Sequence, residues 1–267
     1  MAEPDRTEPD AGLFERLTAP FVRVLEGIGR FLMLTLSTLV WTLRPPYRIG
    51  QVLLAMEFVG VQSVFIVALT GVFSGMVFAL QIVYALKQFS AEGAVGSIVA
   101  IALTREIAPV FAALMVTARA GSAMAAELGN MRVTEQIDAL VTMGVSPAQY
   151  LITPRLLASM LMLPLLCVLY NCIGMVGAWV VAVEGLGVDP GIFILNIEEY
   201  LVPMDFWMSE IKSLAFGVII ALICCHQGFH ASGGARGVGQ ATTRAVVQSA
   251  VAILIANYFI TSVLTDV

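Results

Sequence analysis

The sequence predicts an all-α integral membrane protein, and two observations support that prediction. The 267-residue chain has a mean hydropathy of +0.90 and only 12% charged residues, whereas soluble domains carry about 25% charge. Its apolar residues come in unbroken runs, and roughly 18 apolar residues are long enough to cross a bilayer core of about 30 Å. We therefore expect a helical bundle in a membrane rather than a soluble core.

The N-terminal region is expected to lie outside the membrane core. Residues 1–12, MAEPDRTEPDAG, are acidic and contain prolines, which is typical of a disordered tail and not of a signal peptide. Residues 13–48 begin with a helical pattern in which Arg16, Arg23 and Arg30 recur on one stripe opposite an apolar face. Such an amphipathic helix lies along the headgroup layer, and the RPPYR motif ends it.

Residues 49–267 are expected to hold five transmembrane helices, at about 58–86, 98–126, 153–183, 208–229 and 245–264. In the first span, the GVFSG motif places Gly71 and Gly75 on one face, where small residues let two helices approach closely. In the third span, Pro164 is expected to introduce a kink. The stretch between the third and fourth spans is a longer loop, with or without a short helix within it.

Lys and Arg residues set the expected orientation, because cytoplasmic loops of membrane proteins are enriched in them. With the N-terminus in the cytoplasm, eleven of the fourteen fall on the cytoplasmic side. Lys87 and Lys212 then fall outside, and Arg105 lies within a span. We therefore expect a cytoplasmic N-terminus and a periplasmic C-terminus.

A short charged segment, ELGNMRVTEQIDALVTMGVSP at residues 127–147, interrupts the apolar runs after the second span. Its spacing predicts a cytoplasmic amphipathic helix over about 131–145. Two roles fit this helix: it caps the bundle, or it docks on a soluble partner. The expected inward face holds Val133, Ile137, Leu140, Val141 and Gly144, and the outer face holds Glu135, Asp138 and Thr142.

Several other kinds of site find little support in the sequence. His226 and His230 lie one helical turn apart beside two cysteines, but the thiols are adjacent and no carboxylate follows nearby, so we predict no metal site. There is no GxxxxGK[ST] motif, and we expect no nucleotide site, no cofactor and no catalytic residue in this chain. No basic patch is interleaved with aromatic residues, which argues against nucleic acid as a partner.

Ionisable residues within the spans are candidates for a functional site. A charge at membrane depth costs about 2.5–3.5 kcal/mol, so it normally faces a cavity or a partner. Arg105 and Glu106 lie in the second span, Lys212 lies near the outer end of the fourth, and adjacent helical residues need not pair with each other. These residues either line a cavity or form ion pairs that lock helices, with Lys212 as a candidate partner.

A stripe on the first span is a second candidate, although ordinary helix packing produces the same spacing of three or four residues. Its members are Phe78, Gln81, Ile82, Ala85, Leu86 and Phe89.

Three stretches of the sequence resemble the MlaE/YrbE family of permease subunits: TREIAPVFAALMVTARAGSAMAAELGNMRVTEQIDALVTMGVSP, then PRLLA, and later GVGQATTRAVV. The likeness covers nearly all of the chain after the tail. It implies an ABC transporter of the bacterial inner membrane that moves phospholipids or related lipids together with MCE proteins. The implied partners are a second copy of the chain, a cytoplasmic ABC ATPase, a periplasmic MCE-domain protein and phospholipid, with or without a small STAS-type cytoplasmic subunit.

The resemblance also implies roles for single residues. The segment 132–143 becomes a coupling helix that fits a groove on the ATPase, with Arg132, Glu135, Asp138, Ala139 and Gly144 as coupling residues. Phe78, Ala85, Leu86 and Phe89 match positions that line an acyl-chain pocket, and Arg105 and Glu106 match polar positions near that pocket; Gln81 and Lys212 complete the candidate lipid site. Asn257 stands where relatives can carry an acid, so the role of that position stays open.

Two other classes of function remain as alternatives. A secondary transporter or channel would use Arg105, Glu106 and Lys212 as a charge relay, although five spans do not supply the matching halves of the common inverted-repeat plan. A structural scaffold of an envelope complex would hold no lipid.

Overall fold

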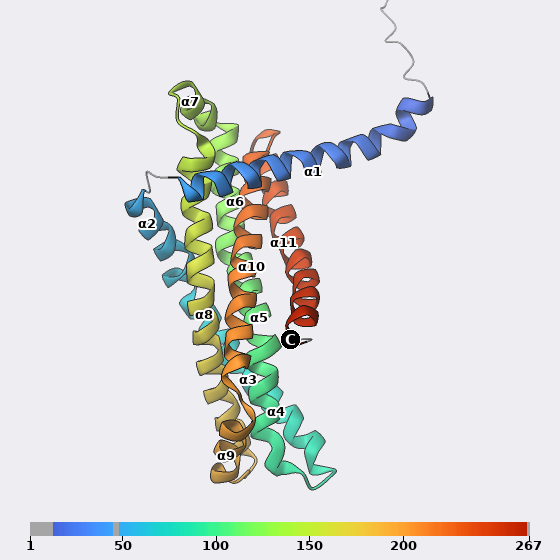
Figure 1. The fold of residues 1–267 in the computed structure, drawn as a ribbon, viewed down its shortest axis with the longest axis vertical. Coiled ribbons are helices and arrows are strands. Elements are labelled where there is room, and N and C mark those ends of the chain that lie inside the picture. Colours follow the sequence, from blue (N-terminus) through green and yellow to red (C-terminus); the bar gives the residue numbers. More distant parts are fainter. Residues whose placement is uncertain (1–12, 45–47, 266–267) are drawn as a thin grey trace, which may run out of the picture.

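The computed structural model describes residues 13–44 and 48–265, and this part of the chain consists of helices and turns without strands. Five helical segments in it are long and apolar enough to cross a membrane, and they form an elongated bundle (Figure 1). They are Ile49–Lys87, Glu92–Val133, Ala148–Gly185, Pro203–Phe229 and Gly234–Leu264. The predicted all-α membrane fold with five spans is confirmed. The expected tail, residues 1–12, lies outside the described residues.

Most of the spans are built from several elements in series. The first contains α2 (Ile49–Val59), the 3-10 turn η1 (Val61–Ser63) and α3 (Val64–Lys87). The second contains η2 (Glu92–Ala94), α4 (Val95–Ala102), η3 (Leu103–Ile107), α5 (Ala108–Val116), η4 (Thr117–Gly121) and α6 (Ser122–Val133). The third contains η5 (Ala148–Ile152), α8 (Thr153–Trp179) and η6 (Val180–Gly185); the fourth is α10 (Pro203–Phe229), and the fifth is formed by α11 (Gly234–Thr265). The segments η3, η4, η5 and η6 are π-helical.

All five spans begin earlier than hydropathy predicted, the fifth at Gly234 rather than at about residue 245. The added residues are partly polar, as in GARGVGQATTR. Hydropathy marks only the part of a helix that fits the bilayer core, whereas backbone hydrogen bonds continue the helix into the headgroup layer. At about 1.5 Å per residue, the 31-residue fifth span is roughly 46 Å long, which exceeds a core of about 30 Å.

Glycines bring α3 and α8 into close contact, as the GVFSG motif predicted. A Cβ atom on Gly71 would lie 3.2 Å from the carbonyl oxygen of Tyr170, and one on Gly75 would overlap the carbonyl oxygen of Gly174. The Ser74 hydroxyl also lies 2.6 Å from the Tyr170 hydroxyl. Backbone contact between these two helices therefore fixes one side of the bundle.

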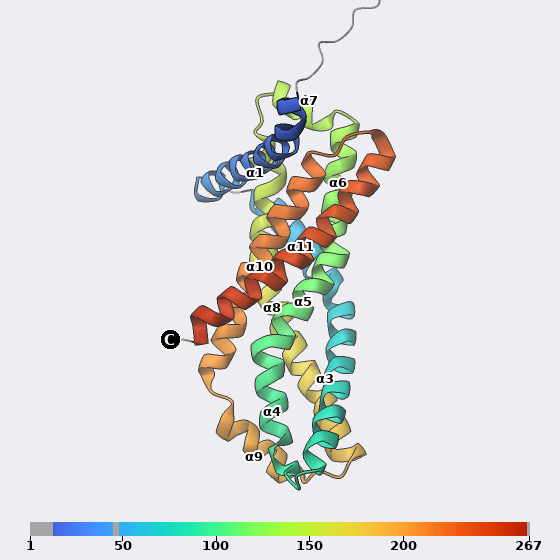
Figure 2. The same cartoon turned by 90° about the vertical axis from the view of Figure 1, so that its right-hand side faces the viewer.

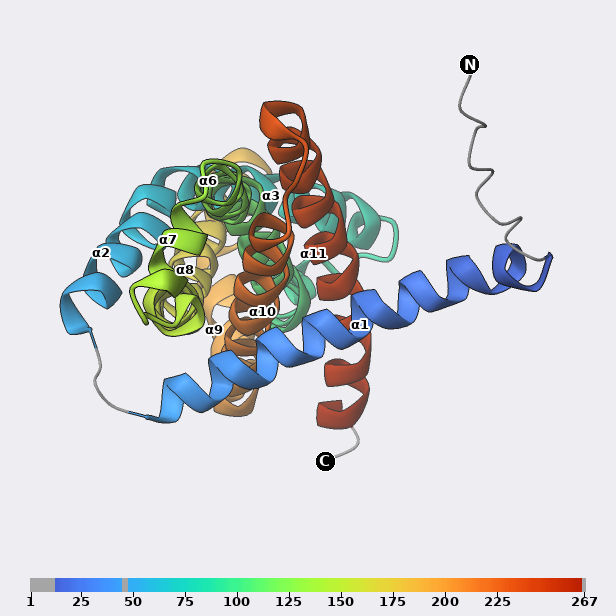
Figure 3. The ribbon, with the colours of Figure 1, turned by 90° about the horizontal axis from the view of Figure 1, so that it is seen from above.

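Helix α1 (Leu13–Leu43) lies across one end of the bundle, nearly perpendicular to the spans (Figures 1 and 3). It contacts η5, α8 and α10, and Leu34 and Thr38 are its buried residues among those with described side chains. Its N-terminal half extends away from the other helices. This geometry suits the expected place in the headgroup layer, which stays a prediction.

The charged segment after the second span differs from the single helix expected over about 131–145. Helix α6 continues to Val133, and a separate short helix, α7 (Gln136–Thr142), forms the tip of that end of the bundle (Figure 1). Between them, Glu135 has a φ of 60°, in the left-handed region. The chain turns there because a left-handed residue cannot continue a right-handed helix.

The opposite end of the bundle holds the turn between α3 and α4 and the short helix α9 (Pro190–Tyr200), which lies in the expected longer loop (Figure 2). Asp189 begins α9 by accepting a hydrogen bond from the Ile192 N–H at 2.9 Å. Helix α11 leans across the bundle, and its C-terminal end stops near the middle of the long axis. Its outer surface is largely uncovered, since only 11% of the residues in its most apolar stretch are buried.

Candidate functional site

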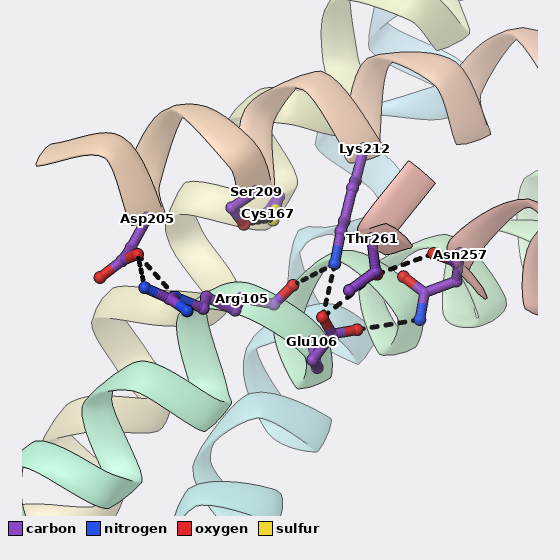
Figure 4. Close-up of polar contacts among 8 residues, drawn as sticks. All are labelled: Arg105, Glu106, Cys167, Asp205, Ser209, Lys212, Asn257 and Thr261. Atoms are coloured by element: carbon purple, nitrogen blue, oxygen red, sulfur yellow. Dashed lines mark hydrogen bonds and ion pairs between the residues drawn. The ribbon is translucent and has the colours of Figure 1, made fainter. Parts of the chain in front are cut away.

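A cluster of polar side chains joins η3, α10 and α11 around Glu106 (Figure 4). The Lys212 ammonium lies 2.7 Å from Glu106 Oε1. The Asn257 amide donates to Glu106 Oε2 at 2.9 Å; the Thr261 hydroxyl lies 3.2 Å from Glu106 Oε1 and 2.7 Å from the Asn257 carbonyl oxygen. Glu106 therefore holds three helical segments together through one carboxylate.

Arg105 points to a different partner, as expected for adjacent residues of a helix. Its Nε and Nη2 both lie 2.6 Å from Asp205 Oδ1, at the start of α10. Asp205 is buried, and its Oδ2 accepts a hydrogen bond from the Val202 N–H at 3.2 Å. Sequence reasoning missed Asp205, because an acid at the edge of a loop looks like an ordinary solvated residue.

The local sequence explains how η3 presents this cluster. An α-helical N–H donates to the carbonyl four residues earlier, but Pro109 has no N–H to donate to the Arg105 carbonyl. The Lys212 ammonium donates to that oxygen instead, at 2.8 Å. Lys212 thus binds both the side chain of Glu106 and a backbone oxygen that proline leaves available.

The charges of the Glu106 cluster balance, with two bases (Arg105 and Lys212) and two acids (Glu106 and Asp205). Lys212 is 2% exposed, whereas the side chains of Arg105 and Glu106 are 40% and 41% exposed. The side of the cluster that α10 forms is therefore buried, whereas the side that Arg105 and Glu106 form is partly exposed. The expected ion pair with Lys212 is present, and the open side leaves the alternative of a cavity wall standing.

Asn257 is the second residue at this site to which sequence reasoning gave no role. Its amide nitrogen binds Glu106, while its Oδ1 is buried and has no hydrogen-bond partner among the described residues. A neutral amide here supplies a donor to the carboxylate, where an acid would repel it.

The stripe on α3 packs apart from the Glu106 cluster. Phe78, Ile82 and Leu86 are partly buried against an apolar core formed by α3, α4, α8 and α9. Gln81, Ala85 and Phe89 are exposed, and Phe89 lies beyond the end of α3 at Lys87. Because α3 and α4 are joined by a short turn, the whole stripe lies nearer that turn than Glu106 does.

An apolar cavity of about 550 Å³ lies between α8, α9 and the start of α10. Its wall includes Thr104, Asn171, Trp179 and Phe206 and none of the residues proposed from the sequence. The Asn171 Oδ1 atom is buried and has no partner among the described residues. Nothing in the sequence separates such a wall from ordinary core packing, because both consist of apolar residues at helical spacing.

The expected coupling residues lie at the α7 tip. Arg132 belongs to α6 rather than to the short helix, and its Nη1 lies 2.6 Å from Asp138 Oδ1. Glu135, Ala139 and Gly144 are exposed. The tip is thus mainly solvent-facing, with one exposed ion pair.

The inward face of α7 is narrower than expected. Ile137 is buried and packs with residues of α1, α6 and η5, but Val141 is 56% exposed. The expectation was wrong for Val141 and Gly144 because α7 has only seven residues, Gln136–Thr142, which make about two turns. Val141 and Met143 therefore present apolar surface at the tip.

The histidine pair beside the cysteines forms a ring contact. The His226 and His230 rings lie 4.4 Å apart, and His226 also packs edge-on against Phe31 of α1. Within residues 13–44 and 48–265, no group of three or more His, Cys, Asp or Glu residues is placed to hold a metal ion.

Comparison with known proteins gives one consistent result. Residues 52–263 match the family described as Permease MlaE. A probable ABC transporter permease protein of Rickettsia bellii is 40% identical over 240 residues, which cover 90% of this chain and 93% of that protein. The intermembrane phospholipid transport system permease protein MlaE of Haemophilus influenzae is 38% identical over 210 residues, 78% of this chain and 80% of that protein.

A plant protein is also similar to this chain. The chloroplastic protein TRIGALACTOSYLDIACYLGLYCEROL 1 of Arabidopsis thaliana is 40% identical over 207 residues, which cover 78% of this chain and 59% of the plant protein. The family match spans every predicted transmembrane segment, including the Glu106 cluster and the α7 tip. This chain belongs to the MlaE permease family.

Proposed function

We propose that this chain is the membrane permease subunit of an ABC transporter that moves phospholipid and draws energy from ATP hydrolysed by a separate subunit. Family membership supports this proposal, as do relatives named as ABC transporter permeases and as a phospholipid transport permease. The proposed setting is a bacterial inner membrane, with the N-terminus in the cytoplasm and the C-terminus in the periplasm.

The observation that best supports a lipid site is the half-open Glu106 cluster. Four charges that cancel within the cluster sit on helices apolar enough to span a membrane. The exposed sides of Arg105 and Glu106 can exchange their intramolecular partners for the phosphate and the cationic or hydroxyl part of a headgroup. Acyl chains would then extend toward the α3–α4 turn, along Phe78, Gln81, Ala85, Leu86 and Phe89.

A second copy of the chain would complete this site. Glu106 is 41% exposed and bonds to α11, whose outer face is apolar and uncovered. Packing α11 against a partner copy would shield the carboxylate from lipid chains while leaving a space between the two copies. The proposed periplasmic partner is an MCE-domain protein, with or without a STAS-type subunit on the cytoplasmic side.

The α7 tip is the proposed docking site for the ATPase. It offers the acidic residues Glu135 and Asp138 together with exposed Val141 and Met143. A basic groove with an apolar floor would complement this surface, and charge complementarity would select the partner.

The deciding experiment reconstitutes the permease with its ATPase and measures transfer of labelled phospholipid. We expect transfer to stop without ATP and to persist when the proton gradient is collapsed. The opposite pattern would favour a secondary transporter that uses the Glu106 cluster as a charge relay. Recovery of the purified complex without bound lipid, by mass spectrometry, would favour a scaffold.

Photocrosslinkers test the site itself. Placed at Leu86 and Phe89, they should capture labelled phospholipid more strongly than at Leu161 and Leu165, which are exposed on α8. Equal capture at both places would mean that the stripe only meets bulk membrane.

A further inference from the structure

A second cavity, which is partly polar, lies at the α7 end of the bundle and is lined by residues of α2, α6, η5 and α8. It has a volume of about 320 Å³, within the range of small-molecule sites. Gln51, Glu127, Tyr150 and Arg155 form its polar part, and Leu54 and Phe58 lie in its apolar part. We call it the α2 cavity. Helices α2 and α8 pack against each other, and in Figure 1 α2 begins close to the end of α1.

The polar part of the α2 cavity contains hydrogen-bonding capacity that the described residues do not use. Arg155 Nη2 lies 2.8 Å from Glu127 Oε2, and Arg155 Nη1 donates to the Leu151 carbonyl at 3.4 Å. A guanidinium has five N–H donors, so these contacts leave others available. Gln51 Oε1 is buried and has no partner among the described residues.

A second cation stands nearby. The Arg48 guanidinium lies over the Tyr150 ring, 4.5 Å from its centroid. The cavity wall itself contains a largely covered cation, Arg155 with 12% of its side chain exposed, and a more exposed acid, Glu127 with 57% exposed. Apolar side chains begin directly beside them.

The cavity lies far from the Glu106 cluster along the second span. Glu127 follows Glu106 by 21 residues within the helical run Glu92–Val133. At about 1.5 Å per residue this separation is roughly 30 Å, the thickness of a bilayer core. The α2 cavity and the Glu106 cluster are therefore separate sites, one bilayer thickness apart along one span.

We propose that the α2 cavity binds the headgroup of a zwitterionic aminophospholipid from the leaflet on the α7 side. The phosphate binds Arg155, since guanidinium donors match phosphate oxygens. The ammonium binds Glu127 and Gln51 Oε1, which lacks a donor in its absence. One acyl chain lies beside Leu54 and Phe58. The Arg155–Glu127 pair is thereby replaced by two equivalent charge-assisted contacts.

The test uses the full-length protein in nanodiscs of phosphatidylethanolamine and phosphatidylglycerol, with a photocrosslinker at Leu54. We expect capture to favour phosphatidylethanolamine. Arg155→Gln should lower capture about tenfold, which corresponds to about 1.4 kcal/mol, and Arg155→Lys should restore part of it. Glu127→Gln should reverse the preference toward phosphatidylglycerol, because it removes the partner of the ammonium and leaves Arg155 for the phosphate.

Two matched controls separate this site from bulk membrane. Glu57→Gln removes an exposed carboxylate from α2 that is not part of the cavity wall, and it should leave both lipids captured as before. A crosslinker at Phe65, which is 76% exposed on α3, should show no dependence on Arg155. Glycerophosphoethanolamine, a headgroup without chains, should not lower lipid capture when it is added before irradiation.

Several results would overturn the proposal. Unchanged capture in Arg155→Gln would show that Arg155 does not bind the phosphate. Equal losses in Arg155→Gln and Glu127→Gln, without a change in lipid preference, would mean that the ion pair only stabilises the fold. Loss of lipid capture when the chain-free headgroup is present during irradiation would make a soluble phosphodiester the ligand. If Arg155→Gln does not fold, Glu127→Gln decides alone. Because the measurement is binding, its failure leaves the transport proposal untouched.

Discussion

Replacing Glu106 with Gln should destabilise the folded protein more than replacing Lys212 with Met, although the two residues form one ion pair. Glu106→Gln leaves the ammonium of Lys212, which is 2% exposed, with only the Arg105 carbonyl and a neutral amide. Leaving a buried charge unpaired costs about 3–5 kcal/mol. Partial exposure of Glu106 places the expected loss at the lower end, about 3 kcal/mol.

Lys212→Met has a smaller expected cost, because Glu106 keeps the Asn257 amide as a donor and stays partly exposed. The Asn257 amide still donates to the carboxylate at 2.9 Å, and the Thr261 hydroxyl stays 3.2 Å from it. We expect a loss of about 1–2 kcal/mol. In the double variant the buried charge and its partner are both absent, so its loss should be smaller than that of Glu106→Gln alone.

Unfolding in mixed micelles with a denaturing detergent measures these differences, with the fluorescence of the three tryptophans as the signal. Glu184→Gln, at an exposed site in η6, is the matched control and should change stability little. A larger loss for Lys212→Met than for Glu106→Gln, or strictly additive losses in the double variant, would refute the argument from burial.

Other predictions address the α7 tip, the helix contacts and the proposed dimer. Replacing Glu135 and Asp138 with Lys should release the ATPase in a pull-down while the bundle stays folded, because like charges against a basic groove cost several kcal/mol. The control variant Glu198→Lys, on exposed α9, should retain the ATPase. Gly75→Ala should cost more than about 2 kcal/mol, since its Cβ overlaps the Gly174 carbonyl, whereas Gly50→Ala, with open space around it, should stay within about 0.5 kcal/mol. Val251→Cys on α11 should give a disulfide-linked dimer on oxidation, and Phe73→Cys on α3 should not; the reverse would move the proposed interface to α3.

Much of the fold could be predicted because membrane helices are read from local sequence. A bilayer core demands long apolar runs, and these fixed the number and order of the five spans. Helix ends could not be placed as well, because polar helical turns such as GARGVGQATTR look like a loop to hydropathy. The division between α6 and α7 was also hidden, since it depends on the backbone angle of one residue, Glu135.

The site could be predicted only in part. Arg105, Glu106 and Lys212 were found because charges within a membrane span are costly and need partners. Their pairing was harder to predict, because Asp205 and Lys212 lie 100 or more residues later in the chain and reach η3 only through the packing of α10. The sequence around Asn257 and Arg155 does not indicate a role for either residue, because their contacts depend on which residues of other helices face them.

The π-helical segment η3 helps to set which residues of the second span face α10. A π turn holds one residue more than an α-helical turn, so deleting one residue within Leu103–Ile107 would leave an ordinary α-helical turn and change which side chains point at α10. Glu106 would then face away from Lys212, or α5 and α6 would lose their packing against α10. Insertions and deletions among related chains should accordingly fall in the turn after α3 and in the segment after α8, where no such alignment of faces has to be kept.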